Sequence, residues 1–77
     1  MIPRALPKLA TDALHAGWNV DITHRYAAIL ACFDRGDDTV RIEWWWTKGR
    51  FTVDASSINR EPTPYTQCVR LIREVDA

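Results

Sequence analysis

Four stretches of alternating apolar and polar residues, separated by short turns, restrict what this chain of 77 residues can fold into. Side chains of a β-strand point to opposite faces in turn, so alternation with a period of two predicts a strand with one buried face. The alternation predicts strands at about 18–24, 27–33, 40–46 and 50–55. The stretch 27–33 is apolar at both parities, which is typical of a central strand.

The turns between these stretches predict one antiparallel meander. Lys48 and Gly49 form a two-residue turn in which glycine supplies the positive φ, residues 35–38 form a four-residue loop, and Arg25 and Tyr26 form a turn. All three resulting pairings place the same apolar set on one face, and a shift of one residue would destroy that agreement. The predicted pairs are Trp46–Phe51, Trp45–Thr52, Trp44–Val53, Phe33–Val40, Ala31–Ile42, Ile29–Trp44, Ile22–Ile29, Val20–Ala31 and Trp18–Phe33.

Two segments with helical periodicity flank the meander. The first, at about 7–16, has Pro7 at its first position and Gly17 just past its end, which suits both residues. The second, at about 64–75, follows Thr63, whose hydroxyl can cap the start of a helix. Each segment carries one apolar stripe, which predicts that it packs on the apolar face of the sheet.

The predicted fold is a single α+β domain over residues 1–77, with residues 1–5 as a loose tail. It is a two-layer sandwich in the order helix, four-stranded antiparallel meander, helix, with both helices on one sheet face. The opposite face is left over, and an exposed aromatic beside arginines is typical of protein contact centres. We therefore predict a surface for a protein partner or a second copy at Trp45, Leu30, Arg41, Glu43 and Arg50. The alternative is that Trp45 folds over its cross-strand neighbours on an ordinary solvated face.

The charge balance bears on the class of partner. Ten basic and ten acidic residues give a formal charge of zero, whereas proteins that bind nucleic acid usually carry a basic excess. Arg41, Lys48, Arg50 and the three sheet tryptophans nevertheless keep nucleic-acid binding as the alternative function. The longest apolar run, at 27–33, is too short to span a bilayer, and no secretory signal precedes Cys32 or Cys68. We expect a cytoplasmic protein whose two thiols pack as small hydrophobes.

Titratable residues give no pattern that predicts an enzyme, and we expect a non-enzymatic protein. The spacing of cysteines and histidines matches no metal site, so neither a metal nor a cofactor is expected. The tripeptide at 35–37 matches a cell-adhesion motif, but a hairpin turn explains it better. The one candidate catalytic residue is His24, next to Arg25 and Tyr26 at the end of the first predicted strand. A histidine in such a turn is more often simply polar.

The order helix, Gly17-Trp18, strands, helix resembles the double-stranded-RNA-binding domain and the similarly folded HicA-type toxin, an mRNA interferase. The segment from Leu9 to Trp18 looks like the toxin's first helix and Gly-aromatic pair. In place of the toxin's Gly-Ser-His stands Thr23-His24-Arg25, so the resemblance implies a degenerate RNA-targeting site at His24 with Arg25 and Arg41. The basic cluster that RNA-binding domains place at the start of the last helix is absent. The short chain, rich in Arg, Ala, Asp and Trp, also resembles accessory proteins of actinobacterial phages, some of which bind host proteins in the host cytoplasm.

Overall fold

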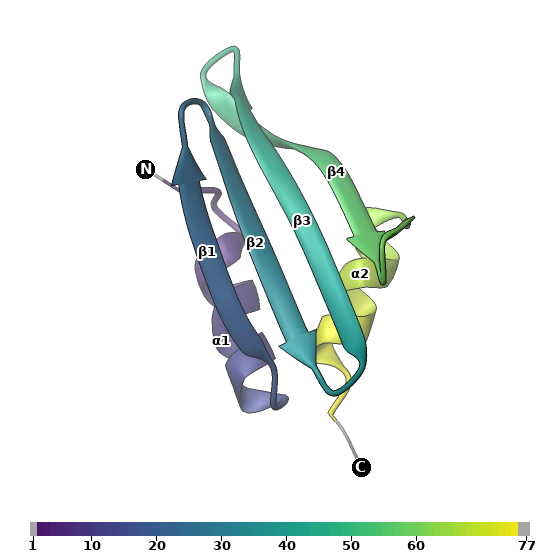
Figure 1. Cartoon of the computed structure of the whole chain (residues 1–77). Coiled ribbons are helices and arrows are strands. Elements are labelled where there is room, and N and C mark those ends of the chain that lie inside the picture. Colours follow the sequence, from purple (N-terminus) through teal and green to yellow (C-terminus); the bar gives the residue numbers. More distant parts are fainter. Residues whose placement is uncertain (1, 76–77) are drawn as a thin grey trace.

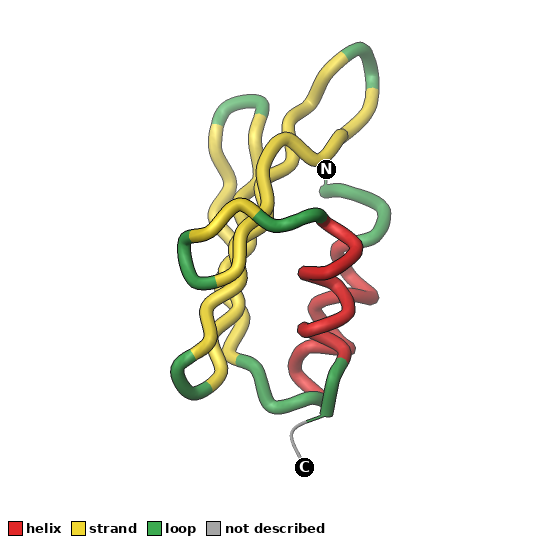
Figure 2. Tube along the Cα trace, turned by 90° about the vertical axis from the view of Figure 1, so that its right-hand side faces the viewer, coloured by secondary structure: helices red, strands yellow, loops and turns green. Residues whose placement is uncertain are grey.

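The computed structural model describes residues 2–75. Over these residues two helices pack on one face of a five-stranded antiparallel sheet (Figures 1 and 2), which confirms the α+β class. The strands are neighbours in sequence order. The elements are α1 (Leu6–His15), β1 (Asn19–Arg25), β2 (Ala28–Arg35), β3 (Asp38–Thr47), β4 (Arg50–Ile58), β5 (Glu61–Pro62) and α2 (Tyr65–Arg73).

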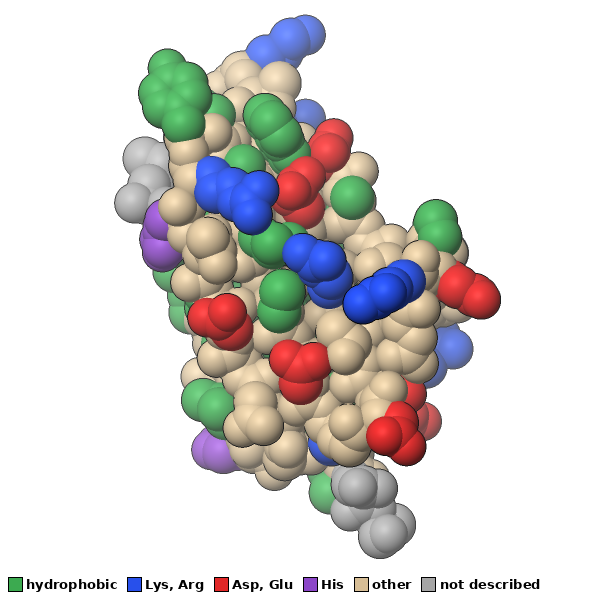
Figure 3. Space-filling view, in the orientation of Figure 1, with side chains coloured by type: hydrophobic (Ala, Val, Ile, Leu, Met, Phe, Trp, Pro, Cys, Tyr) green, Lys and Arg blue, Asp and Glu red, His purple; other side chains and the backbone are tan. Residues whose placement is uncertain are grey.

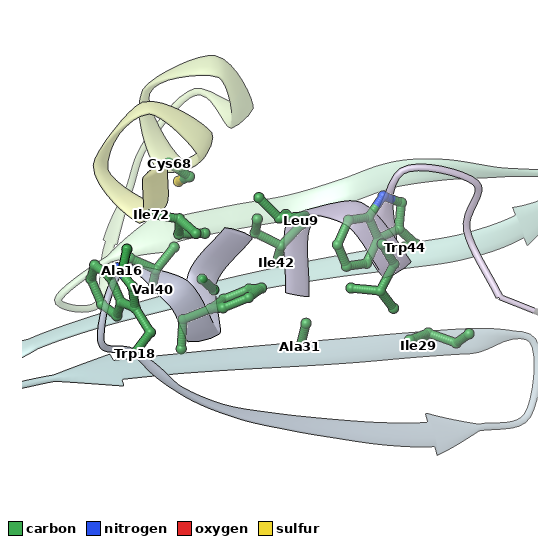
Figure 4. Close-up of a cluster of buried hydrophobic side chains, with 13 residues drawn as sticks. Leu9, Ala16, Trp18, Ile29, Ala31, Val40, Ile42, Trp44, Cys68 and Ile72 are labelled. Carbon is green, nitrogen blue, oxygen red and sulfur yellow. The ribbon is translucent and has the colours of Figure 1, made fainter. Parts of the chain in front are cut away.

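The core lies between the helices and the sheet. The apolar stripe of α1 and that of α2 meet side chains of β2 and β3 that point to the same face (Figure 4). Each large side chain buried in this way stabilises the fold by about 1.5–3 kcal/mol. The fully buried large side chains are Leu6, Leu9, Phe33, Val40, Ile42, Cys68 and Ile72. The segment predicted as a loose tail also contributes, because Pro3 is buried and its carbonyl accepts a hydrogen bond from the N–H of Leu6.

Most of the predicted register is present, and one pairing is corrected. The β2–β3 and β3–β4 pairs match the expectation, including Phe33 with Val40 and Trp46 with Phe51. Between β1 and β2 the turn is Tyr26-Ala27, so Ile22 faces Ala31 and not Ile29. Ala27 takes a positive φ of 62° there, a conformation that is common for glycine and cannot be predicted from an alanine. The shift is two residues, and an even shift leaves every side chain on its predicted face.

The turn between β2 and β3 is tighter than the predicted four-residue loop. Gly36 and Asp37 form it alone, with Arg35 paired to Asp38 and Gly36 at a φ of 60°. Arg35 turns back toward the helices, where its guanidinium lies 4.3 Å from the centre of the Trp18 ring. The guanidinium also donates hydrogen bonds to the carbonyl of Ala16 at 2.9 Å and to that of Glu74 at 2.6 Å. Arg35 thus ties the end of α1 to the residue that follows α2.

The last part of the sheet was not predicted. Strand β4 runs three residues further than expected, and its register with β3 shifts between Glu43 and Trp44, which leaves Asp54 as the extra residue of a β-bulge. Beyond the bulge β4 turns at Asn59-Arg60, where both residues have positive φ, and continues into β5. The side chain of Asn59 accepts a hydrogen bond from the N–H of Thr39 and donates one to Asp38.

Neither helix within residues 2–75 has the length and apolar character that crossing a membrane requires.

Candidate functional site

The sheet face that points away from the helices, hereafter the open face, carries the predicted partner surface. In Figure 3 basic side chains run across the middle of this face, between groups of acidic ones. Strand alternation places Arg41, Glu43 and Trp45 of β3 on it, together with Leu30 and Cys32 of β2. All five residues that the sequence singled out therefore lie on the open face. Leu30, Arg41, Glu43 and Trp45 lie on the two adjacent strands β2 and β3, and Arg50 lies at the start of β4.

A cavity of about 680 Å³ hollows the open face between β2 and the C-terminal half of β4. We call it the central cavity. The bulge at Asp54 helps to form it, because a bulge bends its strand away from the regular sheet. The cavity is lined by Arg25, Leu30, Arg41, Glu43, Asp54, Ala55, Ser56, Ser57, Arg60, Pro62, Thr63 and Pro64.

A second cavity of about 470 Å³ adjoins the first toward the β2–β3 turn. Its lining includes Cys32, Asp34 and Thr39. Arg41 and Arg60 line both cavities, so the two guanidinium groups stand at the boundary between them. Arg41 of β3 and Arg60 of the β4–β5 turn are far apart in sequence, and the fold brings these two positive charges to the same part of the open face.

Hydrogen bonding on the open face is unevenly satisfied. Glu43 accepts a hydrogen bond of 2.7 Å from the indole N–H of Trp45, and Asp34 accepts one of 2.8 Å from the hydroxyl of Thr39. The guanidinium groups of Arg41 and Arg60 have neither a hydrogen bond nor an ion pair within residues 2–75. Glu43 and Asp34 thus have donors from within the fold, whereas Arg41 and Arg60 keep their donors free within residues 2–75. On the lining of the central cavity, Arg25 and Asp54 likewise have no side-chain hydrogen bond or ion pair within those residues.

The predicted residues differ in what they expose. Trp45 has 42% of its surface exposed, and its bond to Glu43 holds the ring along the strand beside the central cavity. Leu30 was expected to be exposed, but only 9% of it is, because neighbouring side chains on β1 and β3 cover it. Leu30 therefore forms an apolar floor. Arg50 is exposed but does not line the central cavity.

Arg60 is the site residue that sequence reasoning missed. It follows Asn59 in a turn where an arginine takes a φ of 70°, and neither residue is glycine. Asparagine tolerates this conformation, but an arginine adopts it at a cost of about 1–2 kcal/mol, so the residue type at position 60 gave no sign of the turn. The side-chain bonds of Asn59 to β3 hold the turn in place.

His24 and Arg41 do not come together. Alternation along β1 places His24 on the face toward the helices, whereas Arg41 lies on the open face. His24 lines a separate cavity of about 490 Å³ with Tyr26, Trp46 and Phe51. The structure thus places two of the residues named by the toxin resemblance, His24 and Arg41, on opposite faces of the sheet.

The two cysteines lie in different surroundings. Cys32 is half-buried on the open face, and Cys68 is fully buried in the core. Burial raises the pKa of the Cys68 thiol, which keeps it protonated and unreactive. Within residues 2–75 no three His, Cys, Asp or Glu side chains are grouped so that they could hold a metal ion.

Comparisons of the chain with protein-family models, with curated proteins and with solved structures find no match. The function therefore has to be argued from the geometry of the open face.

Proposed function

We propose that the chain is a non-enzymatic protein-interaction module that binds an acidic segment of a partner protein on its open face. The observation that carries the proposal is the pair of free guanidinium groups, Arg41 and Arg60, at the boundary of two adjoining cavities. Carboxylates match the donor geometry of a guanidinium and form charge-assisted hydrogen bonds with it. A segment that carries such carboxylates would satisfy donors that the fold itself leaves free.

The rest of the central cavity fits a peptide. Leu30 supplies an apolar floor. The half-exposed ring of Trp45 does not line the cavity itself, but it is hydrogen-bonded to Glu43 of the lining and adds an aromatic surface of the kind that is enriched at protein contact centres. Glu43 and Asp54 on the lining limit the positive charge, which favours a partner with a few placed carboxylates over a polyphosphate. The zero net charge of the chain points the same way.

A peptide array whose members run from strongly acidic to strongly basic tests the proposal. We expect the purified protein to bind acidic members, and the variants Arg41→Ala and Arg60→Ala each to lose about tenfold or more in affinity, because each removes a charge-assisted bond. Trp45→Ala should weaken the same members. Arg70→Ala is the matched control, since Arg70 is an exposed arginine on α2, away from the open face.

Three results would count against the proposal. Absence of binding to acidic members would remove it, and so would equal binding by the wild type, Arg41→Ala and Arg60→Ala. Retention of a single-stranded oligonucleotide that falls steeply with salt, without peptide binding, would instead support the nucleic-acid alternative.

A further inference from the structure

Strand β1 leaves one edge of the sheet without a neighbour within residues 2–75 (Figure 1). Arg25 and Ala28 flank a two-residue turn, so they form a hydrogen-bonded pair. In an antiparallel ladder the residues of a strand direct their N–H and C=O groups to its two sides in turn, so those of Val20, Ile22 and His24 point outward, away from β2. These groups have no hydrogen-bond partner within residues 2–75. The edge is seven residues long and contains no proline. Such an edge can pair with another strand.

The helix layer does not obstruct this edge. Asp12 of α1 contacts Arg73 of α2, so the flank of α1 that carries Ala10 and Leu14, roughly opposite Asp12 on the helix, faces the β1 side of the molecule. Leu14 has 60% of its surface exposed, and Ala10 is partly exposed. In the sheet layer Ile22 has 36% of its surface exposed. A chain that pairs with β1 would therefore meet apolar side chains in both layers.

We propose that β1 pairs antiparallel with β1 of a second copy of this chain, about a twofold axis at Thr23. In this register Asp21 lies directly opposite Arg25 of the second copy, and the axis repeats this ion pair. Ile22 lies opposite His24 of the second copy, and these two pairs would form about four backbone hydrogen bonds between the chains. Thr23 lies opposite itself, a favourable cross-strand pair.

The neighbouring registers are less favourable. An axis at Asp21 would place two carboxylates directly opposite each other, which is destabilising. An axis at Ile22 would place Asp21 opposite Thr23 and leave Arg25 opposite Asn19, so neither charge would face an opposite one. Of these three registers only the one with its axis at Thr23 places opposite charges opposite each other, and this self-complementarity favours a second copy as the occupant.

The dimer and the proposed function are independent. A twofold axis at an antiparallel edge is perpendicular to the sheet, so the open faces of the two copies point to the same side of one continuous sheet. Arg25 is the one lining residue of the central cavity that lies on the paired edge. Arg41 and Arg60, which carry the proposed function, lie on β3 and on the β4–β5 turn, away from that edge, and stay accessible. The dimer would present two copies of the central cavity side by side.

Light scattering coupled to size-exclusion chromatography, at concentrations up to about 100 µM, tests the dimer. We expect the wild type to have twice the monomer mass of 8.9 kDa. Asp21→Arg and Arg25→Asp should each weaken the dimer about tenfold or more, because each places like charges opposite each other. An equimolar mixture of the two variants should restore the dimer, since every new arginine then faces an aspartate and every new aspartate an arginine.

The matched control is Val53→Lys, because Val53 is β-branched, has 39% of its surface exposed and lies on β4 instead of the edge. It should remain dimeric. If the charge variants fail to fold by circular dichroism, Ile22→Pro replaces them, since it removes an outward N–H that the monomer does not use. A monomeric wild type would overturn the proposal. So would a dimer that survives the edge variants, or one that only Val53→Lys disrupts.

Discussion

At the scale of single residues, Trp44 and Trp45 are adjacent in sequence and have opposite surroundings. Trp44 is 3% exposed and packs edge-on against Tyr65, with ring centroids 6.4 Å apart, whereas Trp45 is 42% exposed on the open face. We expect Trp44→Ala to lower the free energy of unfolding by about 3–5 kcal/mol, and Trp45→Ala by about 1 kcal/mol. Urea unfolding followed by circular dichroism measures both.

The stability of a domain of this size is about 4–12 kcal/mol, so Trp44→Ala can leave little folded protein. Trp44→Phe provides a milder truncation at the same position and should still cost more than Trp45→Phe. Similar losses at positions 44 and 45 would contradict the assignment of their side chains to opposite faces.

Which face a residue lies on could be predicted from the sequence, but how exposed it is there could not. Alternation placed Leu30, Arg41 and Trp45 on the open face, and the structure places them there. Alternation predicts the face of a side chain but not the fraction of its surface that neighbouring side chains cover, so the burial of Leu30 was not predicted. Arg60 was missed for a different reason, because its place beside Arg41 depends on a turn that its residue type does not mark.

At the scale of elements, the β1–β2 hairpin contains a strained turn. Ala27 has a φ of 62°, where an L-residue costs about 1–2 kcal/mol and glycine does not. We expect Ala27→Gly to raise the free energy of unfolding by about 0.5–1 kcal/mol, the strain relief being partly offset by the greater freedom of glycine in the unfolded chain. Thermal unfolding followed by circular dichroism would detect it as a higher Tm.

Ala55→Gly is the control for that prediction. Ala55 lies in β4 and has no positive φ, so glycine there brings only added freedom in the unfolded chain and should lower the free energy of unfolding by about 0.5–1 kcal/mol. If both glycine variants lose stability equally, Ala27 is not strained.

The element boundaries could be predicted where turn residues mark them. Gly49 marked the β3–β4 turn correctly, and Gly36 lies in the β2–β3 turn, which proved shorter than expected. The β1–β2 turn contains no glycine, and it was misplaced. The bulge at Asp54 did leave a signal, because the large apolar residues Phe51 and Val53 are followed by Ile58, a change of parity within a single strand. The strand predicted at 50–55 stops before this change of parity, three residues short of the end of β4.

At the scale of the whole molecule, Asp12 joins the two helices. Its carboxylate accepts hydrogen bonds from Lys8 on α1 at 3.2 Å and from Arg73 on α2 at 3.1 Å. The bond from Lys8, and with it the one from Arg73, holds the pKa of the Asp12 carboxyl below its ordinary value of 3.8. Because the pKa is lower in the folded than in the unfolded chain, Asp12 contributes stability above pH 3.8, and that stability is lost as the pH falls through the lowered pKa.

The contribution of Asp12 should therefore appear as a pH-dependent difference between variants. We expect Asp12→Asn to be less stable than the wild type in urea at pH 7, and the difference to shrink as the pH falls below 3.8 and through the lowered pKa of Asp12, since the wild type then loses its charge at this position. Arg73→Ala isolates the part that links the helices, because it leaves Lys8 in place, and Arg70→Ala is its control on the same helix. The ion pair is partly exposed, so added salt should also reduce the difference at pH 7. A difference between the wild type and Asp12→Asn that stayed constant from pH 7 through the whole acid titration of the carboxyl would show that Asp12 acts through its shape and not through its charge.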